Sequence, residues 1–152
     1  MKRVLAVTLA VAMSVAVAPA ALGAKKKPLK ATANGWYVFD GVGTASSTPK
    51  GGTYTRCTNN PDTPPVIALA ARYSILNRSA PKSRKYILNG PSGIHFSDSA
   101  STSLKPGAYF HRFRASSIGQ NSLPPGTYTF KLKVGKKTLT AETITLVDDS
   151  TC

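Results

Sequence analysis

The chain has 152 residues and a formal net charge of +14, because 20 Lys and Arg face only six Asp and Glu. A chain of this length folds as one domain with a single core. Six carboxylates, two His and two Cys supply neither the acid-rich loop of a calcium site nor the paired His of a zinc site. We therefore expect no metal and no other cofactor.

The first 24 residues have the three parts of a secretory signal peptide: a cationic start at Lys2 and Arg3, an apolar run, and small residues before the cleavage point. The apolar run covers about 15 residues, fewer than the roughly 20 that a membrane-spanning helix needs. We interpret it as a cleaved leader and not as a retained anchor. Cleavage between Ala20 and Ala24 leaves a secreted, extracellular or envelope-associated chain with no transmembrane segment, whose charge falls to +12 because Lys2 and Arg3 are lost.

Residues 25–34 carry four Lys, one Pro and no apolar periodicity, so they are predicted to form a flexible basic arm. A single β domain is predicted over residues 35–152. There Thr, Tyr, Val and Ile gather in short runs, and Gly and Pro separate these runs at spacings too short for ordinary helices.

Seven or eight strands are predicted in this domain. They cover residues 36–39, 53–57, 66–76, 85–88, 94–96, 108–114 and 127–134, and a last strand follows a turn. Residues 40–52 are predicted to form a loop, and so is the polar run 97–103. Residues 66–76 also fit a helix with Asp62 or Thr63 as its N-cap. We favour a strand, because alternate residues are apolar and would share one face: Ile67, Leu69, Ala71, Tyr73 and Ile75.

The clearest strand pattern is a strict alternation of apolar and polar residues over 127–134, followed by a two-residue turn at Gly135-Lys136. In that register Leu132 lies opposite Leu139, and Phe130 lies opposite Ala141. The apolar positions that follow have the opposite parity. A bulge near residues 142–143, or a last strand buried on both sides, would explain the change.

Short strands separated by Gly and Pro in about 130 residues predict an all-β, two-layer antiparallel β-sandwich. The run Leu123-Pro124-Pro125-Gly126-Thr127-Tyr128-Thr129-Phe130, with the Lys-Val-Gly-Lys hairpin after it, resembles the last two strands of bacterial immunoglobulin-like and fibronectin-III-like modules. The resemblance covers about 25 residues, and it implies an immunoglobulin-like sandwich.

Cys57 and Cys152 are the two cysteines of the chain. Two Cys in a secreted protein usually pair with each other, so a disulfide is predicted. The alternatives are an intermolecular bridge or free thiols. The predicted bridge would fasten the last residue of the chain to an early strand.

The sequence shows no catalytic signature, so a non-enzymatic protein is predicted. His95, Asp98 and a nearby Ser can be combined into a triad, but a surface imidazole beside a Ser-rich loop is the simpler interpretation. His111 is interpreted as an ordinary strand residue. A small secreted hydrolase with an unrecognised site remains a distant alternative.

Positive charge is the feature that suggests a function. Four lysines line one edge of the predicted sandwich, and two arginines would extend the stripe if their strand were a neighbour: Lys131, Lys133, Lys136, Lys137, Arg112 and Arg114. We expect this basic face to bind an anionic cell-wall polymer or another envelope protein. Nucleic acid is not expected, because the aromatic residues are predicted to be buried. The alternative is a structural or protein-interaction module whose lysines serve solubility.

Overall fold

The computed structural model describes residues 26–152. The predicted signal peptide and its cleavage point lie outside the described residues. The described part contains two short 3-10 helices, Pro91–Gly93 and Ala115–Ile118, and nine strands: β1 (Ala31–Asp40), β2 (Ala45–Thr48), β3 (Thr53–Cys57), β4 (Val66–Ile75), β5 (Arg84–Asn89), β6 (His95–Ser99), β7 (Gly107–Arg114), β8 (Gly126–Val134) and β9 (Lys137–Asp149).

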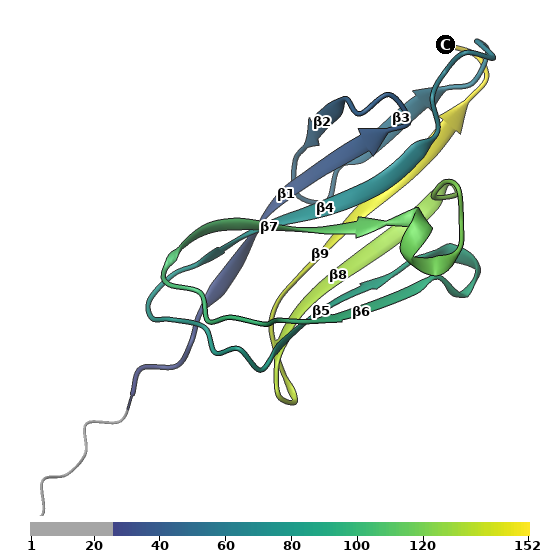
Figure 1. Ribbon diagram of the computed structural model, residues 1–152. Helices are drawn as coiled ribbons and strands as arrows, with labels where there is room; N and C mark the ends of the chain where they lie inside the picture. The colour runs from purple at the N-terminus through teal and green to yellow at the C-terminus, as the bar shows by residue number, and fades with distance from the viewer. Residues whose placement is uncertain (1–25) are drawn as a thin grey trace, which may run out of the picture.

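The strands form two sheets that pack face to face (Figure 1). Sheet A has the order β2-β1-β4-β7, and sheet B has the order β3-β9-β8-β5-β6. The prediction of an all-β, two-layer sandwich is confirmed. The prediction that every pair is antiparallel is wrong, because β3 runs parallel to β9. Since β3 is joined to β9 by most of the chain and not by a hairpin, no short connection forces the antiparallel direction.

Two predicted loops contain strands. β2 lies within residues 40–52, and β6 extends into the polar run that begins at residue 97. β2 is made only of Ala, Ser and Thr, so no apolar pattern marks it in the sequence. Its partner is the aromatic strand β1, which pairs with it from Trp36 to Phe39.

The predicted basic arm is shorter than expected, because β1 begins at Ala31. Leu29 is already buried in the core. The Asn77 side chain anchors the segment just before β1. Its Oδ1 accepts from the Lys30 N–H at 3.0 Å, and its Nδ2 donates to the Pro28 carbonyl at 2.6 Å. The chain is thus anchored several residues before the point at which the arm was predicted to end.

Residues 66–75 form a strand, as favoured over the helix. Four of the five residues predicted to share its apolar face are buried: Leu69, Ala71, Tyr73 and Ile75. Ile67 is different. The register of β1 against β4 shifts between Phe39 and Asp40, so Ile67 is skipped in the ladder and is only partly buried. This irregularity turns Ile67 toward a hollow on the outer side of sheet A.

The core is built around aromatic rings from both sheets. Phe130 of sheet B is fully buried, and its ring lies 6.0–6.3 Å from the rings of Tyr73, Phe113 and Trp36 in sheet A. The Trp36 indole also donates to the Thr143 carbonyl of β9 at 3.0 Å. These contacts fix how the two sheets stack.

The β8–β9 hairpin has the predicted turn but not the predicted register. Val134 pairs with Lys137, and a shift then falls between Lys133 and Leu132, so Leu132 lies opposite Thr140 and Phe130 opposite Glu142. The bulge therefore occurs at Leu139, before the predicted position. It places Glu142, and not Ala141, on the inner face.

Glu142 is buried against an irregularity in β1. The register of β1 shifts between Ala33 and Gly35, and Gly35 has a φ of +107°, where a side chain would be strained and its Cβ would clash with the Thr48 carbonyl. The Gly35 N–H donates to Glu142 Oε2 at 3.3 Å. Among the described residues Glu142 Oε1 has no hydrogen-bond partner, and burial raises the pKa of the carboxyl group.

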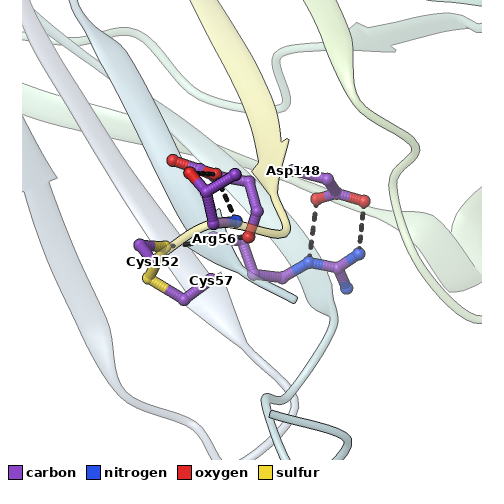
Figure 2. The surroundings of a disulfide bond; sticks show 6 residues. Arg56, Cys57, Asp148 and Cys152 are labelled. Atoms are coloured by element: carbon purple, nitrogen blue, oxygen red, sulfur yellow. Dashed lines mark hydrogen bonds and ion pairs between the residues drawn. A yellow bond between two sulfur atoms is a disulfide. The ribbon is translucent and has the colours of Figure 1, made fainter. Parts of the chain in front are cut away.

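Cys57 and Cys152 form the predicted disulfide, with Cα atoms 5.4 Å apart (Figure 2). The parallel pairing explains how they meet: β3 and β9 end at the same edge of sheet B, where Cys57 pairs with Asp149. Beside the bridge, Arg56 Nε donates to Asp148 Oδ1 at 2.9 Å and Arg56 Nη2 to Asp148 Oδ2. This bidentate pair and the bridge both tie β3 to the end of β9.

Candidate binding surfaces

The structure divides the six predicted binding residues between the two sheets. Lys131 and Lys133 lie in β8 of sheet B, and Lys136 and Lys137 lie at the turn beside them. Arg112 and Arg114 lie in β7, which pairs with β4 at the edge of sheet A. The two outer faces of a sandwich point in opposite directions, so the arginines do not extend the lysine stripe. That part of the expectation is wrong.

We call Lys85, Lys131, Lys133, Lys136 and Lys137 the lysine surface. Lys85 was not among the predicted residues, but it pairs directly with Lys133 across β5 and β8. The alternation of β5 contained the signal, because Tyr86 and Leu88 are buried and Lys85 must then point outward. The rest of this outer face is rich in threonine, as at Thr127 and Thr145, whose hydroxyl oxygens lie 3.2 Å apart.

No carboxylate of residues 26–152 forms an ion pair with the lysine surface. The carboxylates with a basic partner in that range are Asp148, which forms an ion pair with Arg56, and Asp98, which lies within hydrogen-bond distance of His111. Asp148 and Asp149 close β9, whereas Lys137 opens it. At about 3.3 Å per residue, these two ends are separated by roughly 35–40 Å. The two Asp residues are therefore too far away to screen the lysines.

The outer face of sheet A has a different composition. We call Tyr37, Phe39, Phe110, Arg72, Arg112 and Arg114 the arginine–aromatic face. The register places them side by side, since Ala70 of β4 lies between Tyr37 and Arg112, and Ala68 lies between Phe39 and Arg114. Small residues on the middle strand leave room for the long side chains of the two flanking strands.

Two of these arginines lie over aromatic rings. The Arg112 guanidinium carbon is 3.8 Å from the centroid of Phe39, and that of Arg72 is 4.8 Å from the centroid of Tyr37. Arg72 Nη1 also donates to Ser47 Oγ of β2 at 2.9 Å. Such stacking orients the guanidinium plane and leaves its edge free to donate hydrogen bonds.

The arginine–aromatic face is hollowed in two places. The larger hollow has a volume of about 400 Å³, and its lining includes Phe39, Ile67, Arg112, Arg114, Gln120 and Asn121. The smaller has a volume of about 210 Å³, and its lining includes Asn34, Tyr37, Arg72 and Phe110. Each hollow thus combines an aromatic ring, an arginine and a side-chain amide.

Sequence reasoning missed the aromatic part of this face. The run 36–39 is wholly apolar, so it gives no indication that Trp36 and Val38 point inward while Tyr37 points outward. In β7 a signal was present. Phe110 has the same parity as Arg112 and Arg114, so one outward face carries all three, and Phe110 is 55% exposed.

The histidines do not form the triad considered from the sequence. His95 Nδ1 lies 2.7 Å from Asn89 Oδ1, whereas Asp98 Oδ2 lies 2.9 Å from His111 Nε2. The His111 ring stacks on Tyr86 with centroids 3.9 Å apart, and burial lowers its pKa, so the neutral imidazole is favoured. Between residues 26 and 152 no three His, Cys, Asp or Glu side chains are grouped as metal ligands would be. In the same range no helix has the length and apolar character to cross a membrane.

Comparison with known proteins does not assign the chain to a family. No protein-family model matches the chain, and no curated protein matches it significantly. The candidate surfaces therefore rest on the residues and contacts described above.

Proposed function

We propose that the mature chain is a secreted, non-enzymatic, immunoglobulin-like module that adsorbs to an anionic polymer of the cell envelope through its lysine surface. The observation that carries the proposal is a cluster of lysines without an ion pair among residues 26–152: Lys85, Lys131 and Lys133 on the outer face of sheet B, with Lys136 and Lys137 at the adjoining turn.

The strand order supports the immunoglobulin-like assignment. In such domains strands A, B and E share one sheet, and G, F and C share the other, to which variable-type domains add C′. β1, β4 and β7 take the places of A, B and E, and β9, β8, β5 and β6 take those of G, F, C and C′. Tyr128, in the position of strand F, donates its hydroxyl to the Pro124 carbonyl at 2.8 Å, like the tyrosine corner of these domains.

The chain also departs from that pattern. Its disulfide joins Cys57 to Cys152 and not the strands in the B and F positions. Trp36 lies on β1 and not on the strand in the C position. These differences favour a distant variant of the fold with its own way of closing the edge at β3.

The lysine surface carries an energetic cost that a polyanion would relieve. Lys85 and Lys133 are directly opposite on neighbouring strands, and like charges in that position destabilise a sheet by up to about 1 kcal/mol. Phosphate or carboxylate groups bound between them would replace this repulsion with attraction. Lysines on flexible stems suit adsorption to a repeating anion without fixed geometry.

The choice of an envelope polymer follows from the surroundings of these lysines. Threonines and Ile87 are their ladder neighbours, so the paired positions of β5, β8 and β9 on this face offer no aromatic ring to stack on nucleic-acid bases. The predicted export of the chain places it next to acidic wall polysaccharides and phosphate-rich polymers. We take a phosphate-rich wall polymer as the probe.

The experiment measures retention of the mature protein on beads that carry poly(glycerol phosphate). We expect the wild-type protein to bind in about 0.05 M NaCl and to be released by about 0.5 M, because exposed charges are screened over this range. Lys131→Glu with Lys133→Glu should abolish retention while the circular dichroism spectrum stays unchanged. Lys26→Glu with Lys27→Glu, which makes the same charge change in the N-terminal arm, is the matched control and should be retained. Retention that does not weaken with salt, or equal loss in both variants, would contradict the proposal.

A further inference from the structure

We propose that the arginine–aromatic face of sheet A is a second site that binds an acidic polysaccharide, and that Arg112 and Arg114 receive a sugar carboxylate at the larger hollow. This site is on the opposite side of the sandwich from the lysine surface. It differs in kind as well as in position, because two of its three arginines are stacked on aromatic rings and all three adjoin a hollow.

The guanidinium groups of Arg112 and Arg72 are preorganised. Phe39 supports Arg112 from below at 3.8 Å, and Tyr37 supports Arg72 at 4.8 Å while Ser47 holds one of its nitrogens. A planar guanidinium with its edge free matches a carboxylate through two parallel hydrogen bonds. Within residues 26–152 no carboxylate forms an ion pair with any of these arginines. The bidentate donors are therefore available to a ligand.

The larger hollow suits a sugar ring. Its volume of about 400 Å³ lies within the roughly 300–1,000 Å³ of small-molecule sites. Ile67 and Ala68 supply an apolar wall for the C–H face of the ring, and the part of Phe39 that Arg112 leaves uncovered lines the same hollow. Ser116, Gln120 and Asn121 supply the donors and acceptors that ring hydroxyls require.

The face is suited to a polymer and not to a single acidic sugar. Arg72, Arg112 and Arg114 lie in three successive rows of the ladder, because Arg72 pairs with Phe110 and each later row is two residues further along β7. At about 3.3 Å per residue the rows are roughly 7 Å apart. The smaller hollow beside Arg72 continues the same track past Tyr37.

The same contacts disfavour a nucleic acid. Single-stranded nucleic acids bind by stacking their bases on free aromatic faces. Here Arg112 covers one face of Phe39, and Tyr37 meets both Phe39 and Phe110 edge to face at 6.1–6.5 Å. The rings are engaged in holding the arginines and one another. Apart from the exposed part of Phe110, the surface presents guanidinium edges and amide groups.

Isothermal titration of the mature protein with oligogalacturonate tests the site. Two further probes separate charge from sugar: the methyl-esterified oligomer, which lacks the carboxylates, and a thymidine oligonucleotide. We expect oligogalacturonate to bind at least tenfold more tightly than either. Tighter binding of the oligonucleotide would replace the proposal with a nucleic-acid site, and equal binding of the esterified oligomer would overturn the role of the arginines.

Matched variants locate the binding. Arg112→Gln with Arg114→Gln should lower the affinity for oligogalacturonate at least tenfold, and Arg112→Lys with Arg114→Lys at least threefold, because Lys keeps the charge but loses the planar fork. Lys26→Gln with Lys27→Gln is the control for net charge and should change the affinity for oligogalacturonate less than twofold. Each variant is first shown to keep the wild-type circular dichroism spectrum. If Lys131→Gln with Lys133→Gln lowers the affinity as much as the arginine pair does, the site is not on sheet A. Its effect on poly(glycerol phosphate) retention separately tests the function of the lysine surface.

Discussion

The two outer faces of the sandwich carry positive charge in different ways. On sheet B the lysines lie among threonines, and Lys85 and Lys133 oppose each other without an ion pair to any carboxylate of residues 26–152. On sheet A, Arg112 and Arg72 rest on aromatic rings beside two hollows. The first surface attracts any polyanion through its field, and the second has the fixed donors and the cavity that selectivity requires.

The comparison teaches that net charge alone does not define a binding site. The residue type and its neighbours decide whether a cation is a mobile point charge or an oriented hydrogen-bond donor.

The largest effect is expected from separating inner from outer aromatic residues. Phe130→Ala removes the ring around which the core is built, and should lower the free energy of unfolding by about 3–5 kcal/mol. Phe39→Ala, on the outer face, should lower the free energy of unfolding by less than about 2 kcal/mol. Phe39 is only partly buried, and its ring lies against Arg112 at the surface. Urea denaturation measures both. Similar costs would mean that Phe39 belongs to the core and not to a surface site.

Removing the disulfide should weaken sheet B and leave the surface of sheet A intact. We expect Cys57→Ser with Cys152→Ser to lower stability by about 2–4 kcal/mol and the thermal midpoint by several degrees, because the bridge closes a long loop. Hydrogen exchange should rise in β3 and at the end of β9, where the bridge holds the chain. Oligogalacturonate binding should survive. Loss of oligogalacturonate binding would show that the surface of sheet A depends on the disulfide in sheet B.

Glu142 links the sheets and predicts how stability depends on pH. Burial raises its pKa above the usual 4.5, so the folded chain holds this proton more tightly than the unfolded chain does. Its contribution to stability is therefore complete below about pH 4.5 and is lost as the pH rises through the raised pKa. Glu142→Gln removes this loss, so the variant should gain stability relative to the wild-type protein from pH 4.5 to pH 8.

Thermal unfolding of both proteins at several pH values measures that difference. His111, whose pKa is lowered, contributes the opposite trend below pH 6.5, but it is present in both proteins and cancels in the difference. A constant difference between the two proteins would contradict the buried position of Glu142.

The smallest effects are expected from neutralising the two faces. Lys131→Gln with Lys133→Gln should leave the free energy of unfolding within about 0.5 kcal/mol of the wild-type value, or raise it slightly, since repulsion with Lys85 is relieved. Arg112→Gln with Arg114→Gln should cost about 0.5–1 kcal/mol, because the contact of Arg112 with Phe39 is lost. Denaturant titration in one buffer compares them. A larger loss in the free energy of unfolding for the lysine variant than for the arginine variant would contradict this difference between the faces.

The hairpin shows how far a strand pattern can be read. The alternation of 127–134 placed Phe130 and Leu132 inward, and the turn at residues 135–136 formed as predicted. The position of the bulge was wrong, because nothing in the alternation of β9 marks Leu139 as the extra residue. Contacts with sheet A decide it: the free N–H of Gly35 meets Glu142 only in this register.

The arginines also show that a local pattern predicts the face of a strand but not its neighbour. Their spacing correctly placed Arg112 and Arg114 on one face of a strand. Which sheet contains that strand was not encoded locally, since β7 pairs with β4, more than thirty residues away in the chain. The arginines could extend the lysine stripe only if β7 were a neighbour of β8, and its pairing with β4 makes two separate surfaces instead.

The sequence by itself determined the all-β character, the turn at residues 135–136 and the pairing of Cys57 with Cys152. Each depends on local preference or on the presence of a single possible partner. The tertiary structure alone decided the parallel β3–β9 pair, the burial of Glu142 and the grouping of Arg72 with Arg112 and Arg114. The physical reason is that alternation fixes only the side of a strand on which a residue lies. The neighbouring strand is selected by the packing of the whole core, in which distant segments compete for the same partners.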